Sequence, residues 1–176
     1  MPHETYILTR ICKCGNKDDF TLDKITAAFE LDFEKYWKRT PCSRCGGTKT
    51  DSVSHSIPKI DAELLKIWSE NPDYQFSQQD EDLLLAKMEN LPLLLSFFDD
   101  KNLSQPKKAV IASALCTLLF DNLKLKGENY SAEQKSQMQE NQAVLLPELI
   151  QRKNEILAFK DSIWAYIWKE VKGYFE

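Results

Sequence analysis

The spacing of hydrophobic residues along the chain changes near Pro58. Before this residue, apolar and polar side chains alternate in short runs, which indicates strands. Three such runs are predicted strands: 6–11, 29–34 and 53–57. After Pro58, apolar side chains recur every three or four residues, which indicates helices. We therefore expect an α+β fold that is mostly α, with a small β domain at residues 1–57 and an antiparallel helical domain at residues 58–176.

Capping residues and prolines divide the helical region into segments. Six helices are predicted: 62–69, 77–88, 91–98, 104–122, one that begins at 131, and 147–174. The helix at 104–122 is apolar around almost its whole circumference, so we expect it at the centre of the domain with neighbours on every side. Leu115 in this helix and Trp164 in the last one are predicted core residues.

Four of the five cysteines fall in two close pairs, and each pair is followed directly by glycine. In a chain whose N-terminus shows no secretion signal, paired cysteines bind a metal more often than they form disulfides. Four thiolates in a tetrahedron suit zinc, and glycine allows the positive φ that a turn around a metal requires. We therefore predict one structural zinc ion. Its ligands are Cys12, Cys14, Cys42 and Cys45.

Two alternatives stay open at this site. The first pair has a single intervening residue, which is shorter than usual and leaves room for His3 or His55 to replace a thiolate. A redox dithiol would be expected at the start of a helix, whereas Cys42 leads into a glycine turn. A catalytic zinc needs an open coordination position, which four thiolates do not leave.

Cys116 lies in an apolar run, so we expect it to be buried and unreactive.

Length and charge limit the classes of function. The 176 residues are 43% hydrophobic, enough for one ordinary domain, or for one domain with a small appendage. The net charge of −4 argues against a surface built throughout for nucleic acid. No apolar run is long enough to span a membrane, so we expect a cytoplasmic protein with no membrane contact. Because the chain shows no nucleotide-binding or hydrolase motif and has only two histidines, we do not expect an enzyme.

Acidic residues are concentrated between residues 71 and 100, where Lys87 alone opposes seven acids. The negative electrostatic potential of these acids speeds association with a positively charged molecule, so we predict a basic protein as the partner. The candidate contact residues are Asp80, Glu81, Asp82, Asp99 and Asp100. The alternative is that this charge run is only a solvated helix face.

A second candidate surface lies between residues 35 and 50, which contain five cations and no acid. The cations are Lys35, Lys38, Arg39, Arg44 and Lys49. Tyr36 and Trp37 could stack on bases, so the alternative prediction is a nucleic-acid-binding surface or an adaptor in a nucleic-acid-processing complex. The same two aromatic rings could instead form the core of the small domain.

Three resemblances follow from these motifs. The cysteine pairs and their flanking strands at residues 4–57 resemble a zinc ribbon. The stretch from Leu91-Pro92 to Lys107-Lys108 and the small residues after it resembles a HEAT repeat, which implies stacked helices with a binding surface and no chemistry. In size, acidity and absence of catalytic motifs, the chain is similar in kind to bacterial toxin-immunity proteins. That resemblance implies an antitoxin that binds and neutralises a basic toxin; an adaptor in a larger assembly fits the same features.

Overall fold

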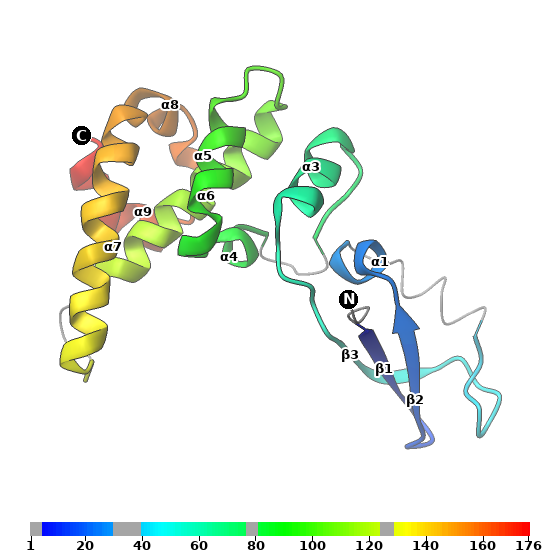
Figure 1. Ribbon diagram of the computed structural model, residues 1–176. Coiled ribbons are helices and arrows are strands. Elements are labelled where there is room, and N and C mark those ends of the chain that lie inside the picture. Colours follow the sequence, from blue (N-terminus) through cyan, green and yellow to red (C-terminus); the bar gives the residue numbers. More distant parts are fainter. Residues whose placement is uncertain (1–4, 30–39, 77–80, 124–128) are drawn as a thin grey trace. The chain divides into compact units, whose positions relative to one another are not determined.

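A computed structural model describes residues 5–29, 40–76, 81–123 and 129–176 (Figure 1). The chain divides into two compact units, Met1–Gln79 and Asp80–Glu176. The first contains a small antiparallel sheet and the second is helical, which confirms the predicted α+β class with mostly helix.

The sheet has three strands: β1 (Tyr6–Cys12), β2 (Lys17–Leu22) and β3 (Thr50–His55). Their order is β2-β1-β3, so β1 lies in the centre and pairs antiparallel with both neighbours. Alternate side chains of β1 are buried, as expected for a sheet with one covered face. Because β1 ends at Cys12 and the pairing with β3 ends at Thr50, both cysteine-bearing segments meet at one end of the sheet.

Strand β2 is absent from the sequence prediction, because only Phe20 and Leu22 are apolar in it. It is an edge strand in which only Leu22 is buried, and its backbone pairing with β1 runs from Tyr6↔Leu22 to Ile11↔Lys17. Of the strand predicted at 29–34, residues 30–34 lie outside the described residues. Phe29 forms an isolated antiparallel bridge with Phe76.

Helices α1 (Lys24–Ala28) and α3 (Ala62–Glu70) belong to the same unit as the sheet. The predicted cap of α3 is confirmed, since the Leu64 N–H donates to the Asp61 carboxylate at 3.0 Å. Lys24 forms an ion pair with Asp61 at 2.6 Å and so ties α1 to the start of α3.

Stacked rings join these helices to the segment that follows α3. The centroids of Phe29 and Phe76 are 5.4 Å apart, and those of Trp68 and Phe76 are 5.6 Å apart. The division between the units therefore falls after α3, whereas the boundary predicted from periodicity lies between residues 57 and 58. The spacing of apolar residues changes where the helices begin, whereas the packing of aromatic side chains determines which unit a helix belongs to.

The helical unit contains nine helical segments in the described residues. They are α4 (Glu81–Leu85), η1 (Met88–Asn90), α5 (Leu91–Asp99), α6 (Gln105–Leu123), α7 (Ala132–Gln151), α8 (Lys153–Ala158), η2 (Lys160–Ser162), α9 (Ala165–Val171) and η3 (Lys172–Tyr174). Helix α6 contacts α4, α5, α7 and α9, and Leu115 in its middle is fully buried. The prediction of a central, covered helix is confirmed.

The predicted single helix at 147–174 is wrong. Helix α7 begins at the capping box formed by Ser131 and Gln134, as expected, but it continues through Pro147 and ends at Gln151. Three further helical segments and a final 3-10 turn follow in place of one long helix. The apolar spacing misled because the separate helices α8 and α9 bury Ile156 and, in α9, Ile167 and Val171, at the spacing that one continuous helix would also give. Trp164, expected in the core, is only half-buried.

Among the described residues, no helix is both long enough and apolar enough to cross a membrane.

Candidate metal centre

The four predicted cysteine ligands lie together at one end of the sheet. Their Sγ atoms are all within 4.8 Å of one another. Cys12 and Cys45 are separated by 3.6 Å between sulfurs, and Cys14 and Cys42 by 3.7 Å. A zinc–sulfur bond of about 2.3 Å gives a tetrahedron with edges of about 3.8 Å, whereas a disulfide bond is about 2.05 Å long. The sulfurs therefore have the spacing of ligands around one ion, which confirms the predicted cluster.

Two turns of similar build present these sulfurs. Gly15 and Gly46 have φ of +82° and +68°, which other residues adopt at a cost. Their N–H groups donate to the carbonyls of Cys12 and Cys42 at 2.8 and 2.9 Å. Each glycine thus closes a turn over a cysteine, as its place after the pair predicts.

The thiols differ in exposure and in acidity. Cys12 and Cys42 are 3% exposed, whereas Cys14 and Cys45 are exposed. The backbone N–H of Cys45 lowers the pKa of Cys42 to about 7. The N–H of Cys14 favours the Cys12 thiolate, but burial and the other three thiols together raise the pKa of Cys12 to about 12. A divalent cation at the centre would offset the mutual repulsion of four thiolates, so this donor set fits a metal ion.

A polar network links the two turns beside the sulfurs. Arg10 is 1% exposed and binds the Asp18 carboxylate at 2.7 Å. The hydroxyl of Ser43, the residue after Cys42, donates to the other oxygen of Asp18. The Asn16 amide donates to both, at 3.0 Å to Asp18 and 2.9 Å to Ser43. The Ser43 and Arg10 contacts hold the pKa of Asp18 below its ordinary value, so this carboxylate stays charged.

Sequence reasoning missed this network, although one signal was present. Arg10 falls on the same face of β1 as Tyr6, Leu8 and Cys12, all of which are buried. A cation in the buried register of a strand needs a partner, because an unpaired charge is costly to bury. Arg10 meets this need with Asp18 and with the Thr40 carbonyl, to which it donates at 2.6 Å.

The histidine alternative is not supported for His55. His55 pairs with Leu8, four residues along β1 from Cys12, or about 13 Å at the rise of a strand. The metal-ligating cluster found in the described part of the chain consists of the four cysteines. His3 lies outside that part. Cys116 is fully buried and its pKa is raised to about 12 by burial, which confirms the buried thiol.

The acids predicted to form one exposed surface have different environments. Asp82 is buried, with 6% exposure, and accepts a hydrogen bond of 2.9 Å from Ser113. Asp99 binds Arg152 through both carboxylate oxygens, at 2.7 and 2.6 Å. Glu81 is half-buried.

Asp100 completes this set of acids. It is half-buried and accepts the Asn102 N–H at 2.9 Å, while Asp80 lies outside the described residues. The expectation that Asp82 is exposed is wrong, because α4 is short and packs this side chain against α6.

The predicted nucleic-acid residues are described in part. Arg44 and Lys49 are exposed beside the metal centre, together with Lys13 and Lys17 from the first turn. Lys13 forms an ion pair with Asp51 at 2.6 Å. Lys35, Lys38 and Arg39, as well as Tyr36 and Trp37, lie outside the described residues.

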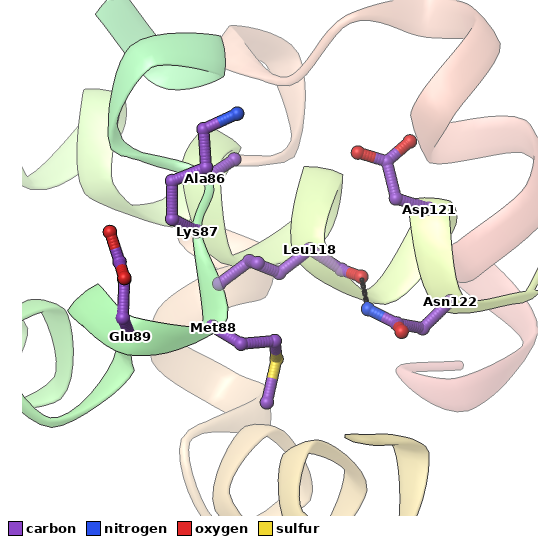
Figure 2. Close-up of a pocket in the computed structure, with 7 residues that line it drawn as sticks. All are labelled: Ala86, Lys87, Met88, Glu89, Leu118, Asp121 and Asn122. Atoms are coloured by element: carbon purple, nitrogen blue, oxygen red, sulfur yellow. Dashed lines mark hydrogen bonds between the residues drawn. The ribbon is translucent and has the colours of Figure 1, made fainter. Parts of the chain in front are cut away.

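A hollow of about 580 Å³ opens in the helical unit between η1 and the end of α6 (Figure 2). Leu118 and Met88 supply its apolar surface, and Lys87, Glu89 and Asp121 bring charges of both signs. The residues that line it include no cysteine, histidine or serine.

No protein-family model matches the chain, and neither a curated protein nor a solved structure shows significant similarity to it. The evidence for the small antiparallel sheet and its four clustered cysteines therefore comes from the structure of this chain. The resemblances to HEAT repeats and to toxin-immunity proteins stay predictions.

Proposed function

We propose that this chain is a non-enzymatic binding protein whose N-terminal unit is stabilised by one structural zinc ion. The observation that carries this proposal is the cluster of four sulfurs, which lie within 4.8 Å of one another and are 3.6 and 3.7 Å apart in two of their pairs. A closed set of four thiolates is typical of structural zinc, because it leaves no coordination position for water or substrate.

Metal analysis tests the first half of this proposal. Protein purified without added zinc should contain close to one equivalent, and the four cysteines should resist alkylation until a chelator removes the metal. Cys116, buried in α6, should stay unreactive in both states. A metal-free protein whose four thiols titrate at once would contradict the zinc centre.

The second half of the proposal concerns the helical unit. We propose that its partner is a basic protein and, more specifically, a toxin that the chain neutralises. Residues 80–176 contain 15 acidic and 12 basic side chains, and a net acidic unit attracts a basic surface over several ångströms. Glu81 and Asp100, the two half-buried acids of the predicted set, are the residues that we propose for this contact.

Exposed apolar residues on α7 add to this support. Val144 and Ile150 are 55% and 51% exposed, whereas Leu145 and Leu149 on the other side of the helix are fully buried. Figure 1 shows the first turns of α7 projecting beyond the other helices of the unit. Val144 and Ile150 are therefore the apolar residues that we propose for contact with the partner.

Association kinetics test the basic partner. Once a partner is captured from the native host by crosslinking and purified, the double variant Glu81→Lys, Asp100→Lys should associate more slowly and with a weaker dependence on salt. Glu170→Lys, an exposed charge reversal on α9, is the matched control. Equal association rates for the double variant and wild type would contradict the acidic encounter surface.

Nucleic-acid binding is the second candidate, favoured by Lys17, Arg44 and Lys49. All three are exposed near the sulfurs, and none forms an ion pair within the described residues. Four thiolates with one divalent ion form a dianion, however, which takes up part of this positive charge. The variant Arg44→Glu, Lys49→Glu should abolish binding of a fluorescent single-stranded RNA if this candidate holds, and binding should weaken steeply with salt.

A further inference from the structure

The two metal-binding turns come from distant parts of the chain, so something must align them before four sulfurs can meet. The first turn joins two strands that pair along their length, and it is therefore fixed by the sheet. The second turn lies in residues 40–49, which contain no helix or strand. Its alignment depends on contacts with the first segment.

Backbone contacts supply only part of this alignment. The Lys13 N–H donates to the Lys49 carbonyl at 3.1 Å, which secures the end of the second segment near β3. The beginning of that segment, at Thr40 and Ser43, is held by side chains instead. We call Arg10, Asn16, Asp18 and Ser43 the Asp18 bridge.

The Asp18 bridge has the properties of a rigid connector. The side chains of Arg10 and Asp18 are 1% and 9% exposed, so their ion pair is shielded from competing water. A buried ion pair stabilises a structure only when further hydrogen bonds satisfy both charges. Asp18 receives such bonds from Ser43 and Asn16, and Arg10 donates to Thr40. Charge-assisted hydrogen bonds that are connected in a network of this kind hold a defined geometry.

From these contacts we propose that Asp18 and Ser43 are positioning residues of the metal centre, which hold the Cys42–Cys45 turn in place before the ion binds. This inference rests on the proposed zinc site. No residue of the Asp18 bridge is a ligand, yet each fixes where Cys42 lies relative to Cys12 and Cys14. Polar groups outside the ligand shell that orient ligands affect metal affinity by about 10–100-fold.

Metal titration of full-length variants tests the proposal. Ser43→Ala removes the hydroxyl that reaches Asp18, and Asp18→Asn removes the charge that binds Arg10. Competition between zinc and a chromophoric chelator should give affinities about 10–100-fold weaker for both. Ser43→Thr, which keeps the hydroxyl, should recover most of the loss.

Asp19→Asn is the matched control. Asp19 is the next residue on β2, points to the exposed side, and accepts a 2.6 Å hydrogen bond from Thr9. Its replacement should leave the affinity unchanged. Cobalt substituted for zinc should show the same tetrahedral thiolate absorption in every variant, because the ligands themselves are intact.

Two results separate the possible failures. If wild-type protein binds no zinc and no cobalt, the proposed metal site fails and the positioning role fails with it. If wild type binds one equivalent but Ser43→Ala and Asp18→Asn bind as tightly as wild type and Asp19→Asn, the site stands and the positioning role is overturned.

Discussion

Gly46 closes the turn that carries Cys42 and Cys45, and its backbone has a positive φ. With φ of +68° and no atom within 4 Å of an added Cβ, its replacement costs conformational energy alone. Gly46→Ala should therefore destabilise the N-terminal unit by about 1–2 kcal/mol, measured by chemical unfolding. Gly173→Ala, at a site that is equally open and has no positive φ, is the control and should be nearly neutral. Equal stability of the two variants would show that the turn tolerates other conformations.

Asp82 was expected on the surface and is instead a buried hydrogen-bond acceptor for Ser113. Asp82→Ala leaves the Ser113 hydroxyl without this partner inside the helical unit and should cost about 1–3 kcal/mol of unfolding free energy. Association with a basic partner should be unchanged, because a buried carboxylate contributes little to encounter. A stable variant that binds more slowly would contradict the buried position.

Asp99 makes the helical unit sensitive to acid. Its hydrogen bonds with Arg152 lower its pKa from the ordinary value of 3.8, so folding favours the charged form. A depressed pKa in the folded state adds stability that is complete above about pH 4 and is lost as the pH falls through the folded pKa. Asp99→Asn should therefore reduce stability at neutral pH and flatten its decline below about pH 4, as measured by urea unfolding at several pH values. An unchanged pH profile would contradict the ion pair.

At the scale of elements, α6 determines the stability of the helical unit. Leu115 is fully buried in this helix, which α4, α5, α7 and α9 all contact. Leu115→Ala should cost about 2–5 kcal/mol in unfolding free energy, because little can collapse into the space that it leaves. Val144→Ala on the exposed side of α7 is the control, with a change below about 0.5 kcal/mol. A small loss at Leu115 would mean that α6 is not the central helix.

At the scale of the whole molecule, the two compact units should respond separately to metal removal. The thiol cluster lies in the N-terminal unit, whereas the helical unit has its own core around α6. Cys42→Ser or a strong chelator should therefore increase hydrogen exchange in peptides from β1, β2 and β3 and leave α6 unchanged. Hydrogen exchange followed by mass spectrometry resolves these peptides. Increased exchange throughout α6 would show that the metal also stabilises the helical unit.

Local chemistry in the sequence was enough to predict the α+β class, the four clustered cysteines, the glycine turns, the caps at Asp61 and Ser131, and the central helix. Each depends on neighbouring residues or on a period that one element carries by itself. Tertiary structure alone decided the placement of α3 with the sheet, the polar strand β2, the burial of Asp82 and the bridge from Arg10 through Asp18 to Ser43. These features rest on contacts between residues far apart in the chain, whose partners no local pattern identifies.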